Sequence, residues 1–129
     1  MRRRSHGERG ASAVEFALVL PLLLMVALAL VQVGLLVRDR LLVEAAARAG
    51  ARTAAVEADR AAIADAVARS APDLDAGALT VGVARVGTQG DPVTVTVGYT
   101  SAIRVPFIGW LITHGVAMTS TATDRQEFG

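Results

Sequence analysis

A run of 22 residues without a formal charge, from Phe16 to Val37, limits the possible folds of this chain more than any other feature. An α-helix rises about 1.5 Å per residue, so the run is about 33 Å long and matches the hydrocarbon core of a bilayer. A cleaved secretory signal has a shorter apolar region, of about 7 to 15 residues. The 91 residues after Arg38 are too few to cover such a helix on all sides. We therefore predict one transmembrane helix within residues 11–37.

The charge distribution predicts how this helix is oriented. Residues 1–10 contain four arginines and Glu8, which gives a local charge of +3 in a chain of net charge +1. Basic segments beside a span stay in the cytoplasm, so we expect a cytoplasmic basic leader (1–10) and an exported C-terminal part. This topology places the protein in the plasma (inner) membrane. The nearly balanced total charge argues against nucleic acid as a partner.

The helical pattern continues beyond the membrane. Residues 38–57 are rich in alanine and free of proline, which predicts a helical extension to about Val56. One of its faces carries small residues every four positions, as in interfaces where helices approach closely. The partner of this face is either another helix or the protein's own exported domain. The residues of this small-residue stripe are Leu42, Ala46, Gly50 and Ala54.

Residues 58–129 predict a small exported domain. The spacing of apolar residues favours a short helix from Asp59 to Ser70, and Pro72 follows its end. Alternating apolar residues then predict a hairpin from Leu79 to Thr100 around the turn GTQGDP, and a third strand over Val116–Thr123. The expected fold is α+β: a long N-terminal helix that spans the membrane and continues as a stalk, a short second helix and an antiparallel sheet of about three strands.

Two further segments are distinctive. Val105–Ile112, VPFIGWLI, is too short to cross a bilayer, and it is expected to cover the sheet, touch the membrane interface through Trp110 or meet a partner. The polar tail from Asp124 to Gly129 is expected to fray.

The sequence contains no recognisable active site. It has no cysteine, and its two histidines, His6 and His114, lie apart from any set of metal-ligating carboxylates. Asp73 and Asp75 resemble the start of a calcium loop but lack its later ligands, so a turn is favoured. We predict a protein that is not an enzyme and has no cofactor, metal or small-molecule substrate.

Glu15 is an acidic residue at the start of an apolar run. Ser12 and Glu15 have the spacing of a capping box, in which each side chain bonds the backbone N–H of the other residue at a helix start. A carboxylate there also meets the positive end of the helix dipole. This structural role explains an acidic residue near the membrane boundary, but it does not explain why a glycine stands at position 10.

The segment from Arg9 to Leu18, RGASAVEFAL, followed by Leu20-Pro21, resembles the N-terminus of the TadE-like family, pseudopilins of the tight-adherence type IV pilus system. The resemblance implies cleavage by a prepilin peptidase between Gly10 and Ala11. Glu15 would then be the fifth residue of the mature chain, and the resemblance implies that it pairs with the N-terminal amine of a neighbouring subunit, as the matching glutamate does in related pilins. Pro21 removes a helical hydrogen bond and is expected to kink the helix.

These observations predict a minor pseudopilin that takes part in assembling a tight-adherence pilus for adhesion or secretion. Its expected partners are the membrane, the prepilin peptidase and other pilin or pseudopilin subunits of the same machine. The alternative is an uncleaved single-pass anchor whose exported domain binds a partner in a cell-envelope machine.

Overall fold

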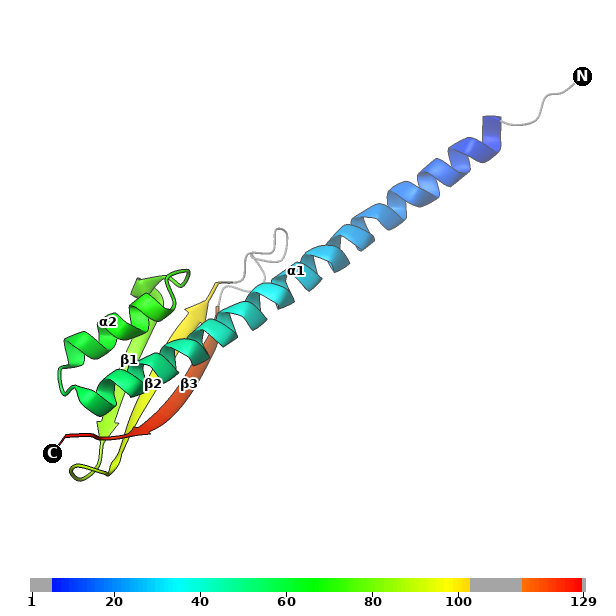
Figure 1. Ribbon diagram of the computed structural model, residues 1–129. Coiled ribbons are helices and arrows are strands. Elements are labelled where there is room, and N and C mark those ends of the chain that lie inside the picture. Colours follow the sequence, from blue (N-terminus) through cyan, green and yellow to red (C-terminus); the bar gives the residue numbers. More distant parts are fainter. Residues whose placement is uncertain (1–5, 103–114, 129) are drawn as a thin grey trace, which may run out of the picture.

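The computed structural model describes residues 6–102 and 115–128, with side chains from Gly10 onward. A long helix projects from a small head in which one face of a three-stranded sheet is covered by two helical segments (Figure 1). This confirms the predicted α+β fold. The elements are α1 (His6–Val56), α2 (Arg60–Ser70), the 3₁₀ turn η1 (Ala76–Ala78), β1 (Leu79–Arg85), β2 (Pro92–Ser101) and β3 (Val116–Arg125).

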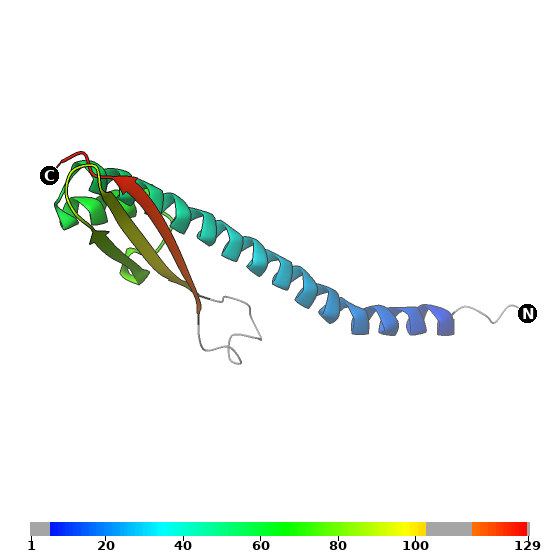
Figure 2. The ribbon, with the colours of Figure 1, turned by 90° about the horizontal axis from the view of Figure 1, so that it is seen from below.

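Helix α1 has 51 residues and ends at Val56, as the sequence predicts. Asp59 then acts as N-cap of α2, because its side chain accepts a hydrogen bond from the backbone N–H of Ala61 at 2.9 Å. Pro21 lies inside α1. Figure 2 shows that α1 changes direction in its blue N-terminal part.

The sheet is antiparallel throughout, in the order β1-β2-β3. Val83 pairs with Val95, and Val95 pairs with Ala122, so the apolar positions of all three strands share one face. The hairpin between β1 and β2 uses positive φ angles at Gly87 (73°) and Gly90 (90°), a conformation that glycine adopts without strain. The sheet therefore has one face for the core and one face rich in threonine.

The core lies between this apolar face and the C-terminal half of α1. Ala46, Gly50 and Ala54 are all buried in it. A Cβ atom built on Gly50 would come within 2.7 Å of Val67 of α2 and 3.0 Å of Val95 of β2. The small-residue stripe is thus covered by the protein's own head, the second of the two alternatives. Its small side chains let α1 approach α2 and the sheet closely.

The C-terminal tail differs from the prediction that it frays. Strand β3 continues through Asp124 to Arg125, and Gln126 is only 5% exposed. The backbone N–H of Glu127 donates to the carbonyl of Ala55 at 2.8 Å. The prediction was wrong because Gln126 bonds backbone groups of the turn between β1 and β2 and Glu127 bonds the end of α1, and these long-range bonds cannot be read from a local pattern. Val105–Ile112 lies outside the described residues.

Candidate functional site

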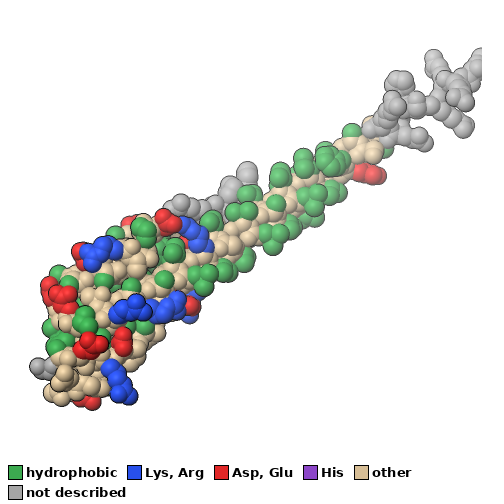
Figure 3. All heavy atoms as spheres, viewed as in Figure 1, with side chains coloured by type: hydrophobic (Ala, Val, Ile, Leu, Met, Phe, Trp, Pro, Cys, Tyr) green, Lys and Arg blue, Asp and Glu red, His purple; other side chains and the backbone are tan. Residues whose placement is uncertain are grey.

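The N-terminal half of α1 exposes apolar side chains on all sides, and Figure 3 shows one of these sides. The most apolar 18-residue window has a mean hydropathy of 2.7, and none of it is buried against the rest of the protein. Water does not stabilise such a surface, whereas the hydrocarbon of a bilayer does. By length and composition, this helix is able to span a membrane.

Glu15 carries the one formal charge between Ala11 and Val37. Its neighbours Val14 and Phe16 are 61% and 63% exposed, and Glu15 is exposed as well. In lipid, a carboxylate without a partner raises the free energy by on the order of 3 kcal/mol near the centre of a span and by less near its ends. The position therefore favours a cationic partner for this carboxylate.

The structure does not contain the predicted capping box. A capping box forms at the first turn of a helix, where backbone N–H groups lack helical partners. Helix α1 begins at His6, so Ser12 and Glu15 lie within it rather than at its start. The prediction fails for the uncut chain because the leader extends the helix. Removal of residues 1–10 would make Ala11 the first residue, and Ser12 would then lie at a helix end.

The predicted cleavage position lies in the same helix. Gly10 and Ala11 are exposed, and a Cβ atom built on Gly10 would meet nothing within 4 Å. Proteases bind extended backbone in general, so cleavage here requires the first turns of α1 to unwind. A glycine lowers the cost of unwinding by about 1 kcal/mol relative to alanine. The side chain of His6 is not described, and His114 lies outside the described residues.

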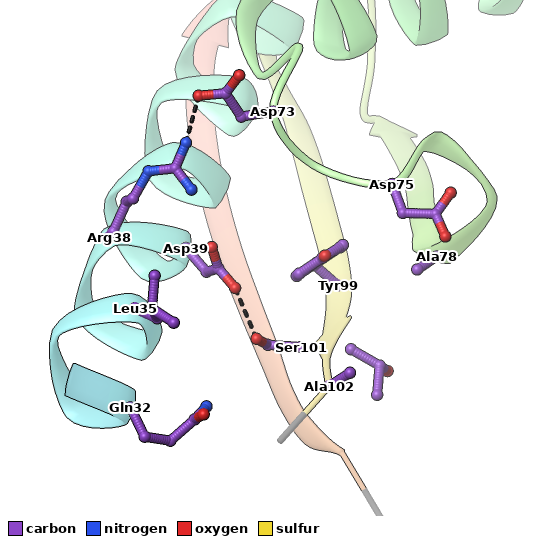
Figure 4. A pocket seen from close by; sticks show the side chains of 11 residues that line it. Gln32, Leu35, Arg38, Asp39, Asp73, Asp75, Ala78, Tyr99, Ser101 and Ala102 are labelled. Carbon is purple, nitrogen blue, oxygen red and sulfur yellow. Dashed lines mark hydrogen bonds and ion pairs between the residues drawn. The ribbon is translucent and has the colours of Figure 1, made fainter. Parts of the chain in front are cut away.

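The other end of the apolar run is held to the head by two polar contacts (Figure 4). Arg38 of α1 forms an ion pair with Asp73, in the turn after α2. Ser101, the last residue of β2, donates a hydrogen bond from its hydroxyl to Asp39 at 2.6 Å. The contacts join α1 to two separate elements of the head. They therefore fix the direction in which α1 leaves the head.

A cavity of about 190 Å³ lies beside these contacts, between α1 and the end of β2. Asp39 and Tyr99 contribute to its walls, and Asp75 caps η1 by accepting from the N–H of Gly77 at 2.9 Å. Asp73 and Asp75 thus serve the turn and its contact with α1, which agrees with the turn interpretation. The described part of the chain has no cluster of three or more side chains suited to a metal ion.

Sequence reasoning did not identify Arg38, Asp39 or Ser101 as contact residues. Arg38 and Asp73 are 35 residues apart, and Asp39 and Ser101 are 62 apart. Their pairing depends on how the head folds against α1. Charged residues just beyond an apolar run are ordinary flanking residues of a span, so their sequence positions alone do not indicate a contact.

The fold and this exposed helix define a class of protein, namely one that carries a small α+β head on one helix able to span a membrane. The family comparison is more specific. Residues 10–52 match the model of a family described as TadE-like protein. This match confirms the resemblance over that range and supports an association with the tight-adherence pilus. Neither the curated proteins nor the solved structures contain a match.

Proposed function

We propose that this protein is a minor pseudopilin of a tight-adherence pilus. It spans the inner membrane once, with its N-terminus in the cytoplasm. A prepilin peptidase removes residues 1–10, and the mature helix then bundles with other pilin or pseudopilin subunits through Glu15. The head remains on the exported side. The family match over residues 10–52 supports the association with the pilus. Leader cleavage and the pairing of Glu15 are what the resemblance of the N-terminal segment implies.

The observation that carries the proposal is the placement of Glu15. It is a single exposed carboxylate at one end of an exposed apolar helix. Bundled helices exclude water around such a group, so a cation beside it lowers its free energy. The chain has no basic residue between Ala11 and Val37. The cation must therefore come from a terminus or from another chain.

Cleavage supplies such a cation. A free amine at Ala11 has a reference pKa of about 7.7 to 8.0 and is mostly protonated at neutral pH. Ala11 precedes Glu15 by four residues, which is about 6 Å along a helix axis. Two parallel helices staggered by about 6 Å therefore place the amine of one subunit level with Glu15 of the next. The charge pair would fix the axial register of the bundle as well as neutralise both groups.

Leader removal also changes the cost of moving the helix end. The leader carries a net charge of +3, which holds this end in the cytoplasm. After cleavage, the charges that oppose movement of this end into the membrane are those of the new amine and of Glu15, which are opposite in sign. One cleavage event therefore has two effects. It removes the positive charge that retains the helix end in the cytoplasm, and it creates the positive charge that Glu15 binds.

The mass of the N-terminal peptide tests the proposal. Membranes from cells that contain a prepilin peptidase should yield a chain beginning at Ala11, and cells without it should yield the uncut chain. Gly10→Leu should block cleavage, because a bulky side chain replaces the hydrogen before the cut. Gly7→Leu is the matched control in the same leader and should leave cleavage intact. An uncut chain in cells with active peptidase would contradict the proposal.

The alternative function is an uncleaved membrane anchor whose exported head binds an envelope partner. One observation favours it: the bond between Gly10 and Ala11 lies inside a continuous helix rather than in extended backbone. In that case, both the unsubstituted protein and Gly10→Leu would keep their full N-terminus, and the substitution would leave the activity in the envelope machine unchanged.

A further inference from the structure

The head meets α1 at the end of the apolar run. Ser101, the last residue of β2, donates a hydrogen bond to Asp39, which lies two residues beyond Val37. In the antiparallel pairing of β2 with β3, Ser101 lies opposite Val116, the first residue of β3. Strand β2 therefore ends, and β3 begins, at the side of the head that faces the apolar run (Figure 1). The base of the head is the name used here for the surface formed by Ser101, Ala102, Gly115 and Val116.

The base overlaps the last turns of the apolar run. Gln32 and Leu35 of α1 line the same cavity as Ser101 and Ala102 (Figure 4). Gln32 lies five residues before Val37, which is about 8 Å along a helix axis. The headgroup layer on each side of a bilayer is about 5–8 Å thick. With the apolar run across the hydrocarbon core, the base therefore lies at the level of the headgroups on its own side of the membrane.

The surface of the base suits this level. Its exposed residues are small or apolar and carry no charge, namely Ala102, Gly115 and Val116. The buried hydroxyl of Ser101 already has its partner in Asp39. Unpaired backbone groups at strand ends are not stable in the hydrocarbon core, but the hydrated headgroup layer can bond them. The base is thus suited to lie against headgroups without entering the hydrocarbon.

The sequence between the two strand ends has the composition of a membrane-interface segment. It contains Val105–Ile112, VPFIGWLI, which lies outside the described residues. The connection, residues 103–114, is twelve residues long. Six residues out and six back reach at most about 20 Å from the base, because an extended chain spans about 3.3 Å per residue. Tryptophan is enriched at membrane interfaces, and Trp110 is the one tryptophan of the chain.

The described core argues against the sheet as the partner of this segment. Val93, Val95 and Val97 of β2 have no exposed surface, and they form one cluster with residues of α1 and α2. The apolar face of β2 is thus already packed against these helices. Of the roles expected for Val105–Ile112, contact with the membrane agrees best with the level of the base.

We propose that the base of the head is a second membrane contact, which places Ala102 and Val116 among the phospholipid headgroups and brings the apolar residues between them into contact with lipid. This inference rests on the part of the proposed function that places α1 across a membrane. The partner is the phospholipid surface on the side of the head. Such a contact holds the head against the bilayer until the subunit leaves the membrane.

Spin labels on single cysteines test the contact in vesicles of neutral phospholipid that contain the full chain, because the protein has no cysteine of its own. Ala102→Cys and Val116→Cys place a label at the base. Val26→Cys, near the middle of the apolar run, is the control for the span. All three side chains are exposed, so the labels displace no core residue.

Val86→Cys is the matched control at the far end of the sheet. Val86 is exposed and follows Arg85, which pairs with Val93. Val93 and Ser101 are eight residues apart on β2, which is about 27 Å of strand. A label on Val86 therefore stays in water while a label at the base reaches the headgroups.

The depth of each label follows from its collisions with two quenchers, since oxygen concentrates in lipid and a nickel chelate stays in water. The ratio of the two collision rates should be highest at Val26 and lowest at Val86. Labels on Ala102 and Val116 should give a ratio about threefold or more above that of Val86, because the headgroup layer excludes part of the chelate. A ratio at both base positions equal to that of Val86 would overturn the proposal.

The fluorescence of Trp110 provides a second readout without a label. Phospholipids brominated in the upper part of their acyl chains should quench it about twofold, and iodide in the water should quench it little. Quenching by iodide alone would place Trp110 in water. Quenching by neither would place it inside the protein or against a protein partner. Either of these two results would overturn the contact with lipid.

The N-terminal mass of the same protein separates the two proposals. A chain that begins at Ala11 and keeps its base labels in water would refute the second membrane contact and leave the pseudopilin proposal intact. A chain that begins at Met1 and carries its base labels at the headgroups would support the contact and refute leader cleavage. A Val26 label in water would refute the span, on which both proposals rest.

Discussion

Arg38 of α1 forms an ion pair with Asp73, and the two residues connect the end of the apolar run to the turn after α2. One residue further along α1, Asp39 accepts a hydrogen bond from Ser101 at the end of β2. The head is thus attached to α1 where the helix leaves the apolar run, as well as through its core.

The two contacts should differ in their effect on stability. Ser101 is 4% exposed, so Ser101→Ala leaves the Asp39 carboxylate without a buried donor and should cost about 1–3 kcal/mol. Asp73→Asn affects an ion pair whose side chains are 49% and 61% exposed, and its cost should stay below about 1 kcal/mol. Thermal unfolding of the full chain in detergent measures both. A larger loss for Asp73→Asn would contradict this ranking.

Gly50→Ala should destabilise the head. The added methyl group would lie 2.7 Å from Val67 and 3.0 Å from Val95, so α2 or the sheet must shift. Overpacking of this kind costs about 1–3 kcal/mol, although alanine favours the helix by about 1 kcal/mol. Gly34→Ala is the control, since a Cβ atom there meets nothing within 4 Å. Chemical unfolding of the full chain should show a lower midpoint for Gly50→Ala only.

Arg85 should contribute strongly to the end of α1. Its guanidinium donates to the carbonyls of Ala54 at 3.0 Å and Glu57 at 2.6 Å, and it lies 5.6 Å from the ring centre of Phe128. The last carbonyls of a helix lack helical partners and favour a cation. Arg85→Met should therefore cost about 1.5–3 kcal/mol and increase hydrogen exchange near Val56. Arg125→Met, an exposed change in the same sheet, should show neither effect.

Pro21 should cause the bend in the N-terminal part of α1. Proline cannot donate the hydrogen bond that the carbonyl of Ala17 would otherwise accept. Spin labels at Ala13 and Ala27, introduced through cysteines, report the distance across this turn in membranes. Pro21→Ala should lengthen that distance as the helix straightens, and an unchanged distance would refute the role of Pro21. Leu22→Ala, next to the proline, should leave the distance unchanged.

Local patterns in the sequence predict most of the fold. Alanine content and the absence of proline predict the end of α1 near Val56, and alternation of apolar residues predicts the pairing of β1 with β2. The end of β3 was predicted two residues early, at Thr123 instead of Arg125. Asp124 and Arg125 do not follow the apolar alternation, but their pairing with β2 extends the strand.

Long-range contacts of the fold escaped prediction because their partners are far apart in the chain. The bonds from Arg85 to the end of α1 join residues separated by 28 and 31 positions. The capping box at Ser12 was predicted from a local pattern alone. That prediction was wrong because α1 already begins at His6, so Ser12 does not lie at a helix start. Glu15 itself was found because a charge beside a long apolar run is conspicuous in any sequence.

The central claim is that the carboxylate of Glu15 binds the amine that cleavage creates at Ala11 of a neighbouring subunit. The direct measurement is the amount of mature protein that co-purifies with sheared pili in Glu15→Gln and Glu15→Asp variants, with the N-terminal mass confirming cleavage in both. Glu15→Gln should be cleaved normally yet reach the pili at least tenfold less, whereas Glu15→Asp should retain part of the incorporation. Wild-type incorporation of Glu15→Gln would contradict the claim.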